Sequence, residues 1–128
     1  MTISNMVREA HSNAVDKGFW DNSGQTPNIG EKLMLIVSEC SEALEALRKT
    51  DNETKVKPLS SQWDDLVAEY GFETVFREDV KNTFEDELAD VLIRVADLAG
   101  YMGIDLETHV ELKMRYNRGR ERLHGKKF

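Results

Sequence analysis

The sequence predicts an all-α protein built from four or more helices packed as a bundle. Apolar residues recur at the spacing of a helix in several segments, and only two prolines and eight glycines interrupt the 128 residues. The chain has the length of one ordinary domain, and a hydrophobic content of 40% is enough to form a core. We therefore interpret residues 1–128 as a single domain.

The first two predicted helices occupy the N-terminal part of the chain. One covers residues 2–17, and a loop with aromatic residues follows over 18–28. The other, over residues 29–49, has the clearest apolar stripe, formed by Leu33, Ile36, Val37, Cys40, Leu44 and Leu47. We expect Cys40, the only cysteine, to be a buried thiol.

The middle of the chain, residues 50–82, is harder to interpret. A polar loop over 51–58 precedes a short predicted helix, which Ser60 or Ser61 can cap and which ends at Gly71. Residues 72–80 fit either a strand or a helix.

Two further helices are predicted after this segment. Thr83 can cap a helix over residues 83–102, with Asp86 at the capping-box position. Its apolar stripe consists of Phe84, Leu88, Val91, Leu92, Val95 and Ala99. Asp105 can cap a last helix over residues 106–123.

The charge is distributed unevenly along the chain. The net charge is −7, but residues 113–128 carry a net charge of +6, so the remainder carries −13. An acidic body argues against nonspecific binding of nucleic acid and suits a protein that gathers cations. The basic end can contact phosphate groups or pair with the acidic body of the same or another subunit.

Two helices carry acid pairs beside their apolar stripes. Glu39 and Glu42 lie at the edge of the stripe on the second predicted helix, and Glu87 and Asp90 take the same position on the helix that follows Thr83. Residues three apart are neighbours on a helix surface, so packing of the two helices would bring four carboxylates together. The same spacing also occurs on solvated helix faces, and both interpretations stay open.

The ligand types of this cluster indicate a hard cation. Like charges repel strongly in a partly dry site, and a divalent cation between them relieves that repulsion. Carboxylate oxygens without nearby His or Cys favour Mg²⁺ or Mn²⁺. Because Mg²⁺ commonly takes oxygens from substrate phosphates, a phosphate-bearing ligand is the expected partner.

The same motifs resemble those of a known family. ECSEALEAL at 39–47 and EDELADVLIRVADLA at 85–99 resemble the paired acid motifs of the MazG-like all-α nucleoside triphosphate pyrophosphohydrolases. GIDLETHVELKMRYNR at 103–118 is similar to the last helix of that superfamily, including the dCTP pyrophosphatase branch, and FW at 19–20 is similar to its tryptophan-bearing loop.

The chain departs from that family pattern at two points. Ser38 stands where many members have a further glutamate, which leaves open how many metal ions the site holds. The interval between Glu42 and Glu87 is longer than in the commonest members, which predicts an insertion over residues 50–82.

The resemblance implies Mg²⁺-dependent hydrolysis between the α- and β-phosphates of a nucleoside triphosphate, which clears unwanted nucleotides and releases a monophosphate and pyrophosphate. It implies a metal site formed by Glu39, Glu42, Glu87 and Asp90. Either Glu39 or Glu42 would orient the attacking water, so both are candidate catalytic residues. Two alternatives stay open: a catalytically silent module that binds nucleotide or protein through the same groove, and a purely structural oligomer.

Four residues outside the acid pairs are candidate substrate contacts, and three of them lie on the last predicted helix or in the aromatic loop. Lys113 can contact phosphate and Asn117 can form a hydrogen bond with sugar or phosphate, although both also fit a solvated basic helix face. Trp20 either stacks on the base or covers the core.

Arg94 is the remaining candidate for substrate binding. It lies one turn after Asp90. It either reaches phosphate or forms a salt bridge with Asp90 or Asp97.

The apolar stripes also predict assembly and location. They exceed what one chain of this length can bury, so we expect a homo-oligomer, either a dimer or a tetramer, with helices packed across a twofold axis. The N-terminus resembles no signal segment, and no apolar run reaches the roughly 18 residues needed to span a bilayer. We therefore expect no membrane partner and a cytoplasmic location.

Overall fold

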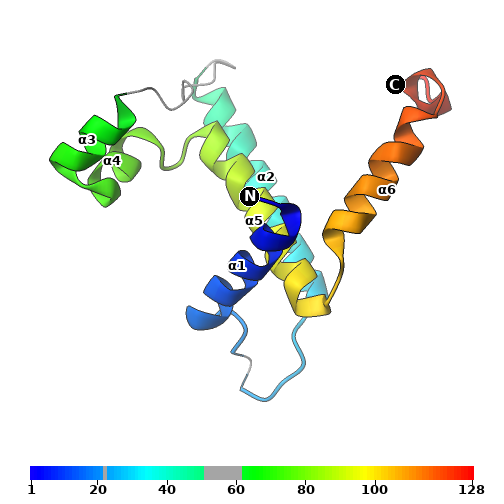
Figure 1. The fold of residues 1–128 in the computed structure, drawn as a ribbon, viewed down its shortest axis with the longest axis horizontal. Helices are drawn as coiled ribbons and strands as arrows, with labels where there is room; N and C mark the ends of the chain where they lie inside the picture. The colour runs from blue at the N-terminus through cyan, green and yellow to red at the C-terminus, as the bar shows by residue number, and fades with distance from the viewer. Residues whose placement is uncertain (22, 51–61) are drawn as a thin grey trace. The chain divides into compact units, whose positions relative to one another are not determined.

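A computed structural model describes residues 1–21, 23–50 and 62–128. Every regular element in these residues is helical, as predicted (Figure 1). The α-helices are α1 (Ile3–Asp16), α2 (Ile29–Arg48), α3 (Trp63–Tyr70), α4 (Phe72–Asp79), α5 (Phe84–Met102) and α6 (Leu106–Arg118), and a 3₁₀ turn covers Arg122–Gly125. The polar loop predicted over 51–58 and the candidate caps Ser60 and Ser61 lie outside the described residues.

The chain divides into two compact units. One comprises Asn28–Arg94, and the other combines Met1–Pro27 with Val95–Phe128. The division falls within α5, so this helix contributes residues to both units. No helix in the described part of the chain is long and apolar enough to cross a membrane.

Both long helices of the unit Asn28–Arg94 begin at side-chain caps. The side chain of Asn28 accepts a hydrogen bond from the backbone N–H of Glu31 at 3.2 Å. Thr83 Oγ1 accepts from the N–H of Asp86 at 3.2 Å, and the Asp86 carboxylate accepts from the N–H of Asn82 at 2.9 Å. The predicted cap at the start of α5 is therefore confirmed.

The described end of the 50–82 segment forms a pair of short helices. Gly71 separates α3 from α4 with a φ of +87°, a conformation that favours glycine because it has no Cβ atom. Residues 72–80, which fit a strand or a helix in the sequence, fold as α4 and its C-cap. Val75 is buried, and the rings of Phe72 and Phe76 lie 5.8 Å apart.

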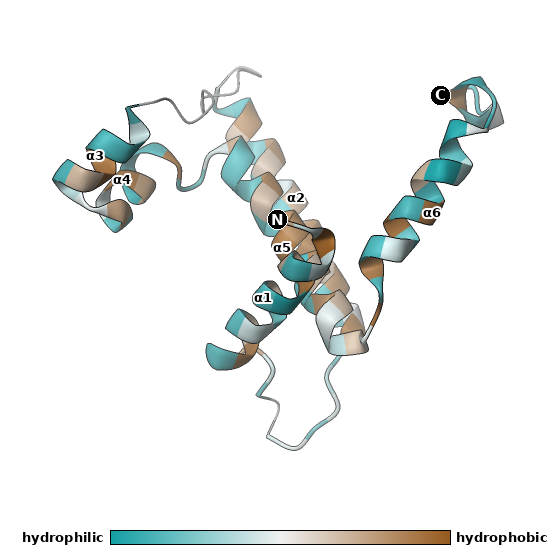
Figure 2. Ribbon diagram, viewed as in Figure 1, coloured by the Kyte–Doolittle hydropathy of each residue, from teal (hydrophilic) through white to brown (hydrophobic). Residues whose placement is uncertain are grey.

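Several large members of the apolar stripes of α2 and α5 are exposed in the single chain, although Ala99 at the end of the α5 stripe is buried. Large exposed side chains include Leu33 (50%), Val37 (50%) and Leu44 (49%) on α2, and Leu88 (46%), Leu92 (56%) and Ile93 (46%) on α5. Figure 2 shows hydrophobic residues along both helices. On α2 the buried residues are instead Glu39 and Ala43. The prediction that Cys40 is buried is therefore wrong for the single chain, because its side of α2 is exposed.

The second unit, formed by Met1–Pro27 and Val95–Phe128, is organised around a cluster of polar and aromatic side chains. Asp97 Oδ1 accepts a hydrogen bond from Trp20 Nε1 at 2.7 Å and lies 2.8 Å from His11 Nδ1. The Trp20 ring stacks on Tyr101 with a centroid distance of 4.2 Å and an interplanar angle of 9°. This cluster joins the loop after α1 to the C-terminal half of α5.

The last helix ends earlier than predicted. Asp105 caps α6 by accepting from the N–H of Thr108, but the α-helix stops at Arg118 rather than at 123. Gly119 is the C-cap, with a φ of −88°, and Leu123 and His124 both have a φ of +53°. The start of α6 is held to α1 by a 2.6 Å hydrogen bond from Ser4 Oγ to Glu107 Oε2.

Replacing Trp20 with phenylalanine is expected to destabilise the protein by about 1–2 kcal/mol, because the indole N–H donates to a charged carboxylate. Urea unfolding measures this loss. Trp63→Phe is the matched control, since Trp63 forms no hydrogen bond with any side chain that the structure describes. Equal losses in the two variants would contradict a role for the bond to Asp97.

Candidate metal centre

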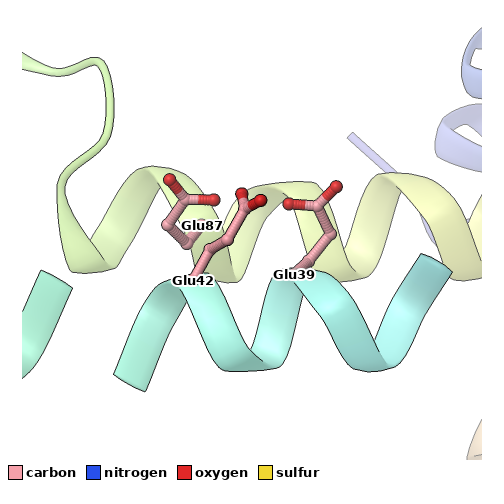
Figure 3. Close-up of side chains that lie close together, drawn as sticks. All are labelled: Glu39, Glu42 and Glu87. Atoms are coloured by element: carbon pink, nitrogen blue, oxygen red, sulfur yellow. The ribbon is translucent and has the colours of Figure 1, made fainter. Parts of the chain in front are cut away.

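Three glutamates converge where α2 packs against α5. Glu39 and Glu42 project from α2 and Glu87 projects from α5, toward one another (Figure 3). One carboxylate oxygen from each lies within 4.8 Å of the others. Glu39 and Glu87 are each only 6% exposed, whereas Glu42 is open to solvent. The cluster is therefore buried on one side and accessible on the other.

Local helix geometry accounts for this arrangement. Glu39 and Glu42 are three residues apart on α2, so their side chains lie on adjacent turns of one surface. Ala43 follows Glu42 directly and is buried, as Glu39 is. The acid-bearing edge of α2, rather than its apolar stripe, forms the contact with α5.

The ionised form of Glu87 is unfavourable at this site. Burial of its side chain, followed by the charge of Glu42 and a hydrogen bond with it, raises the pKa of Glu87 from 4.5 to about 7. The charges of Asp90 and Glu39 raise it further. A group with this pKa is partly protonated at neutral pH, because burial and the neighbouring carboxylates both disfavour its ionised form.

Asp90 lies next to this cluster but is not one of the three converging residues. Burial raises the pKa of its carboxyl group, and the charges of Asp86 and Glu39 act in the same direction. The nearby Arg94 lowers that pKa and partly offsets these effects. Of the four predicted acids, the structure thus groups three and leaves Asp90 one turn away on α5.

Arg94 is the cation nearest to Glu39. Its Nε lies 2.5 Å from Glu39 Oε1, with side chains that are 37% and 8% exposed respectively. The prediction of a salt bridge with Asp90 or Asp97 is wrong, because the guanidinium pairs across the helices with Glu39 and because His11 and Trp20 contact Asp97. Sequence reasoning missed this pair, although Arg94 follows Glu87 by seven residues and so lies on the same side of α5.

The donor set fits a divalent cation. Two oxygens on opposite sides of Mg²⁺ or Ca²⁺ are about 4–5 Å apart, since metal–oxygen distances are roughly 2.0–2.6 Å. The spread of 4.8 Å within the cluster is compatible with a shared ion after small side-chain rotations. Oxygen-only ligands with an open side suit a hard cation that keeps some of its water.

The other candidate residues belong to the second unit. Lys113 Nζ lies 5.3 Å from the centroid of the Tyr116 ring. Asn117 Oδ1 is buried and has no hydrogen-bond partner among the described residues. Trp20 contacts Asp97 and Tyr101.

Comparisons of the chain with protein-family models, with curated proteins and with solved structures found no match.

In metal-free protein, the free energy of unfolding is expected to fall as the pH rises from about 5 to about 7. The folded state keeps the Glu87 proton up to a pKa of about 7, whereas the unfolded chain loses it near 4.5. The folded state binds more protons in this window, so its stability decreases with pH. One pKa unit corresponds to about 1.4 kcal/mol, so the rise from 4.5 to about 7 sets an upper limit of about 3.5 kcal/mol.

Urea unfolding with EDTA, at about pH 5 and about pH 8, measures this dependence. Glu87→Gln removes the titrating group and is expected to remove this part of the decrease. Identical pH profiles for the variant and the original protein would exclude Glu87 as its source.

Proposed function

We propose that this protein is a Mg²⁺-dependent nucleoside triphosphate pyrophosphohydrolase of the MazG-like type. It would cleave between the α- and β-phosphates and release a nucleoside monophosphate and pyrophosphate. The main support is the convergence of Glu39, Glu42 and Glu87 from two helices, with Glu39 and Glu87 buried and Glu42 exposed. Such a site suits a cation that is itself bound to an anionic substrate.

The four acids share one role in this proposal, and one of them has a second role. Glu39, Glu42, Glu87 and Asp90 hold the cation. When bound, Mg²⁺ supplies electrostatic stabilisation of the charge that develops on the phosphates. Glu42 is the better candidate for orienting water, since it is exposed to solvent while Glu39 is buried.

The bond changes follow from this placement. Glu42 accepts a proton from the water whose oxygen forms a bond to the α-phosphorus. The bond between that phosphorus and the oxygen bridging to the β-phosphate breaks, and pyrophosphate leaves with the electron pair. Water is the only co-reactant.

Lys113, Asn117 and Trp20 are the proposed substrate contacts of the second unit. The unpartnered, buried oxygen of Asn117 supports a role in accepting a hydrogen bond, for example from a sugar hydroxyl. The ring contacts of Lys113 and Trp20 hold their side chains in defined positions.

We also propose a homo-oligomer, dimer or tetramer, in the cytoplasm. The half-exposed leucines and valine of α2 and α5 support this assembly, because burial of apolar surface is the main force that drives stable association. Light scattering is expected to give a dimer or tetramer, and a monodisperse monomer would refute the proposal.

One experiment tests the activity directly. The protein is incubated with a panel of ribo- and deoxyribonucleoside triphosphates, with Mg²⁺ or with EDTA, and the products are separated. Monophosphate and pyrophosphate formed only with Mg²⁺ are the expected products. Diphosphate and orthophosphate would refute the proposed cleavage site.

A catalytically silent nucleotide-binding module is the second candidate. Ser38 favours it, because the hydroxyl of Ser38 donates a 2.8 Å hydrogen bond to the carbonyl of Leu35 and supplies no acidic ligand. This candidate predicts that Mg²⁺ and nucleotide together raise the Tm without forming product. A purely structural oligomer predicts no change in Tm.

A further inference from the structure

We propose that Arg94 is the internal counter-ion of the acidic cluster, that a divalent cation displaces it from Glu39, and that the released guanidinium then binds a phosphate of the substrate. This inference rests on the proposed metal site. It adds a coupling between metal and substrate through one residue of α5.

The contact between Arg94 and Glu39 has the geometry of a strong ion pair. Nε of Arg94 lies 2.5 Å from Oε1 of Glu39, which is within the range of a strong charge-assisted hydrogen bond. The Glu39 side chain is only 8% exposed, so little water reaches it and Arg94 is its main partner. In the metal-free protein the guanidinium therefore stabilises a buried carboxylate.

The charges around Arg94 explain why a cation competes with it. Glu39, Glu42, Glu87 and Asp90 carry up to four negative charges, and Arg94 is the only cation that forms an ion pair with any of them in the described part of the chain. One guanidinium cannot neutralise the cluster. A divalent ion brings twice the charge and contacts several oxygens, so it gains more from the same Glu39 carboxylate than Arg94 does.

The Arg94 side chain can move more freely than the Glu39 side chain. Glu39 is buried between the helices, whereas Arg94 is 37% exposed and has a long side chain that can turn toward solvent. When the cation takes the Glu39 oxygen, Arg94 keeps its charge and its planar set of donors. That geometry suits a phosphate group, which a guanidinium binds with two parallel hydrogen bonds.

This exchange makes metal and substrate binding interdependent. Before the cation arrives, Arg94 is engaged with Glu39 and is unable to bind phosphate well. Once the cation has bound Glu39, the Arg94 guanidinium is available to bind phosphate. The metal therefore raises substrate affinity, and by linkage the substrate raises metal affinity by the same factor.

The displacement can be observed without any measurement of activity. In ¹⁵N-labelled metal-free protein, the Arg94 Nε–H is expected to give a separate NMR resonance, assigned by its absence in Arg94→Lys. Titration with Mg²⁺ should shift this resonance strongly or remove it. A resonance that stays unchanged while other amide signals show that Mg²⁺ has bound would overturn the proposal.

Binding to a neutral variant gives an independent test. In Arg94→Gln, Mn²⁺ detected by electron paramagnetic resonance is expected to bind about tenfold more tightly, because Arg94 no longer competes for Glu39. With saturating Mg²⁺, a non-hydrolysable nucleoside triphosphate analogue is expected to bind about tenfold more weakly. If Arg94 only holds Glu39 in position for the metal, both affinities fall, and that result refutes the exchange.

Arg48→Gln is the matched control, because Arg48 is an exposed arginine of α2 that pairs only loosely with Glu45, at 3.9 Å. It should leave both affinities unchanged. Failure of this inference is distinguishable from failure of the proposed function. If Mg²⁺ and Mn²⁺ do not bind at all, both fail, whereas metal binding with an intact Arg94–Glu39 pair overturns only the exchange.

Discussion

Replacing Glu87 with glutamine is expected to reduce Mg²⁺-dependent hydrolysis at least about 100-fold while it stabilises the metal-free protein. Residues that only orient metal ligands commonly change metal affinity or activity by about 10–100-fold, so the loss of a direct ligand should exceed that range. Glu87 is buried, and the carboxylates around it make its ionised form unfavourable. A neutral amide of similar shape removes that repulsion.

The two effects of this substitution have opposite signs, which makes the prediction specific. Above about pH 7 the original side chain is mostly ionised, because its pKa is about 7. Under these conditions, in EDTA, the variant should melt at a higher temperature than the original protein. With Mg²⁺ the original protein should melt at a temperature close to or above that of the variant, since only the original protein gains stability from bound metal.

Thermal unfolding with and without Mg²⁺, together with product formation from the best nucleotide of the panel, measures both effects. Glu45→Gln is the matched control on α2, because Glu45 is an exposed acid that also lies three residues from Glu42. Its effect on stability should stay within about 0.5 kcal/mol, and its activity should be unchanged. Equal losses of activity in the two variants would remove Glu87 from the site.

The helices and the acid cluster were predictable because they depend on local patterns. The apolar spacing on α2 and α5 set their boundaries to within one residue of those observed. The cap formed by Thr83 and Asp86 follows from the side-chain types alone. The convergence of Glu39, Glu42 and Glu87 required only that the two acid-bearing helices pack together.

The direction in which those helices face was not predictable from spacing. A wheel places Leu33, Val37 and Leu44 on one side of α2, but it does not state which neighbour covers that side. In the single chain the side bearing Glu39 and Ala43 is buried instead. The apolar pattern on this side of α2 therefore marks a surface that the single chain leaves exposed, which supports the proposed oligomer.

Contacts between distant segments were also beyond the sequence pattern. Arg94 has acids within reach on its own helix, and local spacing favours them. The observed partner is Glu39, 55 positions earlier in the chain. The same holds for Asp97, whose partners His11 and Trp20 come from α1 and the following loop.

Gly100 is the site of the second large effect. It lies in α5, where glycine ordinarily costs roughly 0.5–1 kcal/mol relative to alanine. A Cβ atom at this position would lie 2.6 Å from Cβ of His11, 3.0 Å from its Cγ and 3.2 Å from the carbonyl oxygen of Val7. The absence of a side chain therefore lets α1 approach this part of α5.

Gly100→Ala is consequently expected to destabilise the protein by about 2 kcal/mol, although the same change stabilises most helices. His11 has little room to move, because its ring lies 2.8 Å from Asp97 and 5.6 Å from the Trp20 ring. The carbonyl of Val7 belongs to the backbone of α1, so relief of the clash requires a shift of the helix. A loss of this size lowers the Tm by roughly 5–10 °C.

Gly119→Ala provides the control, because its added Cβ would lie 3.7 Å from the nearest atom, in ordinary contact, and because its φ of −88° suits alanine. Thermal unfolding of both variants should show a large fall in Tm for position 100 and a small change for position 119. The Trp20 fluorescence should shift in Gly100→Ala as well, since displacement of His11 disturbs the shared contact with Asp97. A higher Tm for Gly100→Ala would mean that α1 does not pack this closely against α5, and the Asp97 cluster would then lose its role in joining them.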